Sequence, residues 1–146
     1  EVPHERAMPF FVRSGDVFVV RGNGNRHLAG KAGLSVEDYE RLFYLDLLIR
    51  LRFDKQKAIP ELATAIWNCP HTHRRLIARA KSTNGIWKIN GKDVRDHSIA
   101  IPPRPEQMTA VRTLQQFGDS LAHARARRSE THSLRRNILA KLGGAQ

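Results

Sequence analysis

Residues 81–90 read KSTNGIWKIN and residues 99–107 read IAIPPRPEQ, and these two stretches organise the chain. The first begins as a basic loop with a glycine, over residues 82–85, and continues into a predicted strand over residues 86–89. The second contains a strand predicted over residues 98–101 and then prolines, which interrupt regular structure. Beyond this proline-rich break the sequence predicts one long helix. We therefore expect a recognition loop on a mixed domain, followed by a helical arm.

The chain carries a large excess of positive charge. Its 146 residues include 25 Lys and Arg against 14 Asp and Glu, which gives a formal net charge of +11. This balance favours a polyanionic partner, of which nucleic acid is the commonest. A membrane surface is the rival partner, but no apolar run approaches the roughly 20 residues that span a bilayer. We therefore expect a nucleic-acid partner and no membrane.

The cysteine content and the N-terminus favour a cytoplasmic location. Cys69 is the single cysteine, so no internal disulfide can form, which suits a reducing cytosol. The first residues mix acidic and basic side chains and lack the apolar core of a signal peptide. The chain begins at Glu1 rather than Met, so we expect a fragment or a processed product.

Apolar and aromatic runs predict β structure in the first third of the chain. Turn residues at 14–16 and 22–25, where Gly and Asn tolerate positive φ, separate these runs. Alternation of side-chain types predicts a further strand after an ambiguous segment. The predicted strands are residues 10–12, 17–20 and 46–53, and residues 27–32 could pair back as another.

From residue 58 to residue 80 the spacing of apolar residues becomes helical. Residues 68–70 end one predicted helix and begin a second one. Trp67 lies on the apolar face of the first helix, so we expect it in the core. No acidic residue occurs between Glu61 and Asp93, so the second helix leads into the loop at 82–85 with strong positive charge.

Two basic loops with glycines are the best candidates for DNA contact. Arg and Lys can donate to phosphates or to guanine O6 and N7, Asn can pair with adenine N6 and N7, and a tryptophan can stack. The alternative is that the charges form a solvated face and the glycines only form turns. The candidates are Arg21, Asn23, Asn25, Arg26 and Lys31 around the first loop, and Arg74, Arg75, Arg79, Lys81, Ser82, Thr83, Asn84, Trp87 and Lys88 around the second.

Cys69, His71 and His73 raise the question of a zinc site. Tetrahedral zinc usually takes four ligands from separated pairs, whereas these three crowd five residues around a proline. We interpret Cys69 as part of a cap region and both histidines as surface groups. We therefore expect no metal.

An enzyme is also a poor fit to the sequence. A nuclease needs clustered carboxylates to hold a metal, but Asp16, Asp46 and Asp54 are spread over predicted strands and turns. No phosphate-binding loop, dinucleotide motif or catalytic triad spacing is recognisable. We expect no catalytic residues and no cofactor, with a metal-dependent nuclease as the less favoured alternative.

The C-terminal segment is predicted to be a helix over residues 106–142, about 55 Å long at 1.5 Å per residue. Its apolar residues alternate in spacings of three and four, interrupted at Arg128 and Arg135. Such a stripe needs a partner helix, although the arginines also permit a basic RNA- or membrane-surface helix. The residues expected to pack against a partner are Leu114, Phe117, Leu121, Ile138 and Leu142.

Taken in order, these pieces resemble one half of a specificity subunit of type I restriction-modification systems. The last piece resembles that family's apolar-Pro-Pro-x-x-Glu-Gln junction between its target recognition domain and its spacer helix. The matching pieces are residues 14–21 with Gly24, Gly30 and Lys31; residues 46–54 and the helices at 58–80; residues 82–90; and residues 99–103 with Glu106 and Gln107.

The resemblance implies an α+β fold: a mixed recognition domain of small sheets and helices over residues 1–103, then one long coiled-coil-type helix over residues 104–146. It implies a non-catalytic subunit that reads double-stranded DNA and docks the methyltransferase subunit, and with it the restriction subunit. Self-association through the long helix is also expected. The main alternative is a basic protein that binds nucleic acid without regard to sequence.

Two departures from the family pattern follow from the residues. The family's subunit has two recognition domains and two helices, and this chain has one set. The strands that normally precede the Gly15-Asp16 turn are not recognisable, so the domain is expected to be short at its N-terminus. We expect either a fragment or a half-sized subunit that restores the second half by dimerising.

Overall fold

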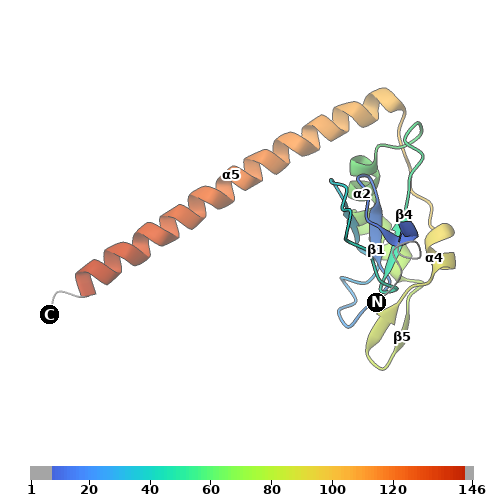
Figure 1. The fold of residues 1–146 in the computed structure, drawn as a ribbon, viewed down its shortest axis with the longest axis horizontal. Helices are drawn as coiled ribbons and strands as arrows, with labels where there is room; N and C mark the ends of the chain where they lie inside the picture. Colours follow the sequence, from blue (N-terminus) through green and yellow to red (C-terminus); the bar gives the residue numbers. More distant parts are fainter. Residues whose placement is uncertain (1–7, 144–146) are drawn as a thin grey trace. The chain divides into compact units, whose positions relative to one another are not determined.

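The computed structural model describes the backbone of residues 8–143 and the side chains of residues 8–136. It has an α+β fold with a long C-terminal helix, which confirms the predicted fold class (Figure 1). In chain order the elements are η1 (Met8–Phe10), β1 (Val17–Val20), β2 (Gly22–Asn23), β3 (Ala32–Leu34), β4 (Leu48–Leu51), α2 (Pro60–Asn68), α3 (Pro70–Ile77), β5 (Lys81–Thr83), β6 (Ile86–Lys88), α4 (Gly91–Arg95) and α5 (Arg104–Gly143).

The first sheet is antiparallel with strand order β3-β1-β4. Val19 lies opposite Ala32 on one neighbour and Ile49 on the other, so these three side chains share a face. Val17 and Val19 are fully buried on this face, whereas Phe18 between them is half-buried on the opposite face. The predicted strand at 17–20 is confirmed, and that at 46–53 is shorter, at Leu48–Leu51.

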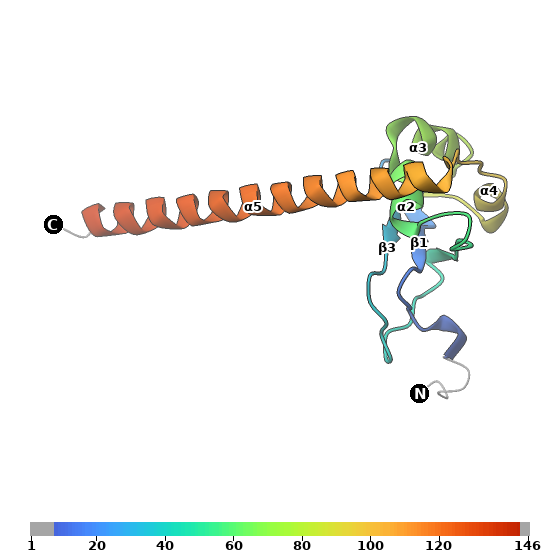
Figure 2. The ribbon, with the colours of Figure 1, turned by 90° about the horizontal axis from the view of Figure 1, so that it is seen from above.

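The core lies between this sheet and the helices α2 and α3, which are consecutive in the chain (Figure 2). Val19, Trp67 and Leu76 meet there, with Ile89 and Val94 from the end of the domain. Trp67 is 3% exposed, and its indole Nε1 donates to the carbonyl of Gly30 at 2.9 Å. The predicted core position of Trp67 is therefore confirmed.

The second sheet has strand order β2-β6-β5 and pairs segments that are far apart in the sequence. Gly22 lies opposite Lys88, and Asn23 lies opposite Trp87. Strands β5 and β6 form a hairpin whose two turn residues, Asn84 and Gly85, have φ of 50° and 76°. This is the conformation that Asn-Gly favours in tight hairpins, so the loop expected at 82–85 is instead a strand end and a two-residue turn.

Contacts within the chain divide it after Met108 into two units, and α5 begins in the first of them. Gln107 lies in the first turn of α5 and is 2% exposed, and its side chain hydrogen-bonds this turn to the preceding part of the domain. Its side-chain oxygen accepts the N–H of Ile59 at 2.9 Å, and its nitrogen donates to the carbonyls of Lys57 and Pro102, each at 2.8 Å. The buried carboxamide thus joins the start of the helix to the segment before α2.

Three expectations about local structure are wrong. Residues 10–12 form no strand, because η1 ends at Phe10 and the pairing of Phe11 with Phe43 is an isolated bridge. Residues 98–101 form no strand either: Ile99 packs on the core, but no neighbouring strand pairs with it. Residues 27–32 are mostly turns, and strand β3 begins only at Ala32.

His73 also differs from its predicted place on the surface. It is 6% exposed on α3, and its Nε2 lies 2.8 Å from the carbonyl oxygen of Ala29. His71, by contrast, is exposed as expected. Cys69 is the C-cap residue of α2 and the N-cap residue of α3, so its predicted place in a cap region is confirmed.

Candidate nucleic-acid interface

The second sheet brings the two predicted recognition loops together. The loop after β2 and the β5–β6 hairpin lie on neighbouring strands, because Asn23 pairs with Trp87. Across this contact the guanidinium carbon of Arg26 lies 4.7 Å from the centroid of the Trp87 ring. That distance is typical of a cation–π interaction. Candidates from both halves of the predicted site therefore form one surface.

Side-chain hydrogen bonds build the first loop. The Oδ1 atom of Asn23 accepts the N–H of Asn25 at 2.8 Å, and Oδ1 of Asn25 accepts the N–H of His27 at 2.9 Å. Two successive turns of this kind fix the path of the backbone without a regular element. Asn23 and Asn25, predicted as readers of adenine, thus have a role in shaping the loop.

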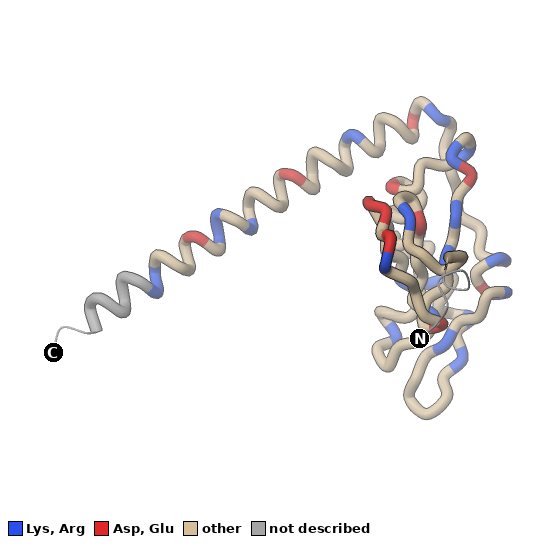
Figure 3. The backbone as a smooth tube through the Cα atoms, viewed as in Figure 1, with Lys and Arg blue, Asp and Glu red and all other residues tan. Residues whose placement is uncertain are grey.

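The hairpin carries the predicted residues of the second loop. Lys81 pairs with Lys88, and both side chains are exposed. Ser82, Thr83 and Asn84 are exposed as well, so the hairpin offers hydroxyls, an amide and ammonium groups to the solvent. Figure 3 shows Lys and Arg on this hairpin and along α5. These are the donor types that contact phosphates and base edges.

Helix α3 contributes a second group of cations. Arg74 and Arg75 are exposed on it, and Arg74 borders a recess of about 360 Å³ together with Arg26. His27 lines the same recess and was not among the predicted residues. Its position immediately after Arg26 was the available signal. The recess therefore continues the cationic surface from the first loop to α3.

Some predicted cations have partners within the domain. The Nζ atom of Lys31 donates to the carbonyl of Asn68 at 3.1 Å. Nη1 of Arg21 donates to the carbonyl of Asp46 at 3.3 Å, and Nη1 of Arg79 to that of Asp93 at 3.4 Å. These hydrogen bonds use part of each side chain's donor capacity, so these three residues are less free to contact a ligand than Arg26.

Positive charges on α3 and just after it affect the pKa of His97, which is buried inside the domain. Burial lowers the pKa of His97 below its ordinary 6.5, and the charges of Arg75, Arg79 and His73 lower it further. Its ring lies edge-on to Trp67, with centroids 4.8 Å apart. Within residues 8–136, neither ring nitrogen of His97 has a hydrogen-bond partner. The imidazole therefore stays neutral in the fold near neutral pH.

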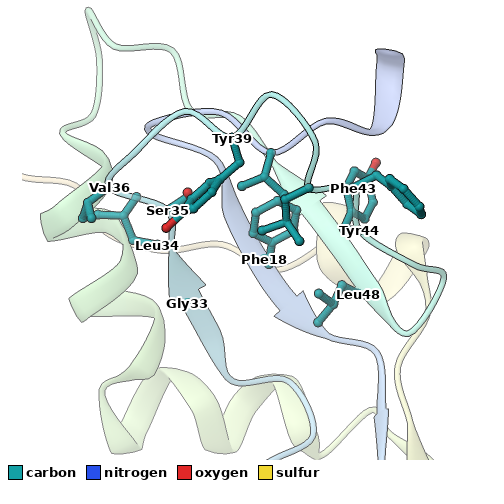
Figure 4. Close-up of a pocket in the computed structure, with 11 residues that line it drawn as sticks. Phe18, Gly33, Leu34, Ser35, Val36, Tyr39, Phe43, Tyr44 and Leu48 are labelled. Atoms are coloured by element: carbon teal, nitrogen blue, oxygen red, sulfur yellow. The ribbon is translucent and has the colours of Figure 1, made fainter. Parts of the chain in front are cut away.

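A second concave surface lies on the other side of the first sheet. Phe18, Tyr39 and Phe43 border a recess of about 460 Å³ beside Gly33, where an added Cβ would meet no atom within 4 Å (Figure 4). No charged residue lines it. It lacks the cations that supply most of the affinity for phosphates, so we do not include it in the candidate interface.

The apolar residues of α5 that we expect to pack against a partner helix lie in the second unit. Leu114, Phe117 and Leu121 are 42%, 70% and 52% exposed, so these apolar side chains are unpaired within the described helix. The side chains of Ile138 and Leu142, also predicted to pack against a partner, lie outside the described residues.

Two general features of the described residues bear on function. No helix among them is both long enough and apolar enough to cross a membrane. They also contain no group of three or more His, Cys, Asp or Glu side chains arranged to hold a metal ion.

In sequence, the chain is similar to two curated type I restriction enzyme specificity subunits, as the resemblance predicted. The chain is 32% identical over 107 residues to the EcoKI specificity subunit of Escherichia coli strain K12, a match that covers 73% of this chain and 23% of that protein. It is 27% identical over 136 residues to the StySPI specificity subunit of Salmonella potsdam, covering 90% of this chain and 29% of that protein.

The chain thus matches about a quarter of the length of these curated relatives. No protein-family model matches it.

Proposed function

We propose that this chain is a non-catalytic module that recognises a DNA target sequence for a type I restriction-modification complex. One observation carries the proposal: in a homologue of specificity subunits, two basic loops from distant parts of the sequence meet at the Arg26–Trp87 contact. Lys and Arg side chains would supply affinity through phosphates, and the loops would supply specificity through base edges.

The experiment is a selection from a randomised duplex DNA pool at physiological salt, with sequencing of the retained fraction. We expect an enriched motif, with each mismatch costing about 1–3 kcal/mol. A retained fraction that is uniform in sequence and falls steeply with salt would contradict the proposal. It would instead support the alternative of sequence-independent binding through charge.

The absence of catalysis is a separate part of the proposal. Plasmid DNA incubated with the protein and with magnesium or manganese should remain uncut, because a nuclease needs clustered carboxylates to hold its metal. Metal-dependent nicking that purifies with the chain would contradict this part and leave the recognition test unaffected.

We also propose that the apolar stripe of α5 docks a partner helix, either a second copy of the chain or the methyltransferase subunit. Leu114, Phe117 and Leu121 supply the exposed apolar surface that such packing needs. Leu121→Asp should abolish self-association in sedimentation velocity. Gln116→Asp adds the same charge at an exposed position away from the stripe and should leave the profile unchanged.

An unchanged profile for Leu121→Asp would contradict docking of a second copy through this stripe. Mixing the purified chain with methyltransferase subunits in the same experiment then tests the other partner.

A further inference from the structure

The first loop offers one planar donor that is already held in position. Asn23 and Asn25 use their Oδ1 atoms to accept backbone N–H groups within the loop. Bidentate pairing with adenine needs that oxygen for N6–H and the amide NH₂ for N7. Reading adenine would therefore compete with the hydrogen bonds that shape the loop. The long side chain next to them, Arg26, has no such role.

The guanidinium carbon of Arg26 lies over the ring of Trp87. The indole is half-buried on β6, and its backbone is paired with Asn23 on one side and Ser82 on the other. The ring is thus fixed by a strand in the middle of its sheet. The cation–π contact, with 4.7 Å between the guanidinium carbon and the ring centroid, keeps the guanidinium over the ring and uses none of its N–H donors as hydrogen bonds.

The surrounding cations are held differently. Arg21 and Arg79 donate to carbonyls of the domain, and Lys31 donates to Asn68. The exposed lysines Lys81 and Lys88 are mobile point charges that suit phosphates rather than a planar pair of acceptors. Within residues 8–136, Arg26 stacks on a ring and has no hydrogen-bond or ion-pair partner.

We propose that Arg26, held over the ring of Trp87, reads a guanine through its O6 and N7 acceptors in the major groove. This inference rests on the proposed function and adds the base class and the residue that reads it. A guanidinium that is already oriented loses less side-chain freedom on binding than a free one, so the pairing gains discrimination. Guanine is the base whose two major-groove acceptors match the guanidinium fork.

The test repeats the DNA selection with the full chain and four variants. The wild type should enrich a motif with one guanine preferred about 5- to 150-fold over the other bases. Arg26→Lys keeps the charge and loses the fork, so it should lose the preference at that position and keep the others. Trp87→Phe keeps a ring of lower cation–π strength, so it should weaken the same preference severalfold.

Two variants serve as controls. Arg41→Lys makes the same chemical change at an exposed position outside the candidate interface and should leave the guanine preference intact. Lys88→Ala should weaken binding to all sequences alike and reduce the salt slope by about one, without changing any base preference.

The outcomes separate the two proposals. If the wild type enriches a motif without a guanine, or if the guanine preference survives in Arg26→Lys, the inference about Arg26 is overturned and target recognition stands. If the wild type enriches no motif, target recognition fails and the guanine reading fails with it.

Discussion

The side-chain oxygen of Gln107 accepts the backbone N–H of Ile59 at 2.9 Å, so the first turn of α5 shares a partly buried hydrogen bond with the segment that leads into α2. The same carboxamide donates to Lys57 and to Pro102. A side chain that satisfies one buried N–H and two carbonyls is costly to remove, because each buried polar group left unpaired costs about 1–3 kcal/mol. Gln107 is therefore a structural residue at the start of the long helix.

Gln107→Ala should lower the free energy of unfolding by about 2–3 kcal/mol, because it leaves these three groups without their partner. Urea denaturation followed by tryptophan fluorescence measures this, since Trp67 lies in the core. Gln115→Ala, at an exposed position of α5, should change stability by no more than about 0.5 kcal/mol. Equal effects of the two substitutions would contradict the structural role of Gln107.

His97 should make the domain sensitive to mild acid. Its pKa is lower in the folded state than its ordinary 6.5, so the unfolded chain binds the proton more tightly. The stability that neutral His97 contributes is present above about pH 6.5 and is lost as the pH falls from there through the folded-state pKa. The slope is at most about 1.4 kcal/mol per pH unit.

His97→Phe should remove this slope, because phenylalanine has a similar shape and no titrating group. Thermal denaturation between pH 7 and pH 5 checks it, with the exposed His71→Phe as the control. The role of His97 would be refuted by a slope that persists in His97→Phe.

Asp16 should affect the stability of the domain over a separate and more acidic range of pH. Burial opposes its ionisation, but hydrogen bonds from Arg52 and from the N–H of Arg13, with the charges of Arg52 and Arg50, lower its pKa below 3.8. Asp16 is 1% exposed, and Nε of Arg52 lies 2.6 Å from its Oδ1. The stability that ionised Asp16 contributes is present above about pH 3.8 and is lost as the pH falls below that value.

Asp16→Asn should destabilise the fold by about 1–2 kcal/mol at pH 7, less than for a fully buried pair because half of Arg52 is exposed to water. It should also remove the loss of stability below pH 4. Asp54→Asn, in the exposed pair with Lys57, is the matched control and should have little effect. A wild-type response to acid in Asp16→Asn would show that other carboxylates dominate.

Asn84 combines two roles that substitution can separate. Its φ of 50° is unfavourable for most side chains, and it is also a candidate base contact. Asn84→Gly keeps the turn and removes the amide, whereas Asn84→Ala removes the amide and strains the turn by about 1 kcal/mol. If Asn84 contacts a base, both variants should change sequence preference equally in competition binding. A change in Asn84→Ala alone would assign Asn84 to the turn.

Regular elements were predictable where local pattern and packing agree. Val17–Val20 has a turn before it and strong β-formers throughout, and the α2–α3 break coincides with Pro70. Residues 98–101 had the composition of a strand but had no neighbour with which to pair. Helix α4 was missed although Asn90 and Asp93 form a capping box, a signal present in the sequence.

The candidate site was predictable as residue types and not as an arrangement. Composition identified the basic loops, but the Arg26–Trp87 contact depends on β2 pairing with β6, and no local pattern encodes such distant pairing. The burial of His73 was missed for a related reason. Its arginine neighbours on α3 suggested solvent, whereas the carbonyl of Ala29 comes from a distant turn.

The β5–β6 hairpin exposes all three residues of β5 and both turn residues, and it adds only half-buried Trp87 to the interior. Outside the two turn residues with positive φ, substitutions at such exposed positions usually change folding free energy by less than about 0.5 kcal/mol. The candidate contact residues of β5 are therefore energetically decoupled from the residues that hold the domain together. Mutation can therefore alter the chemistry of this exposed strand one residue at a time without bringing the domain to the threshold of unfolding.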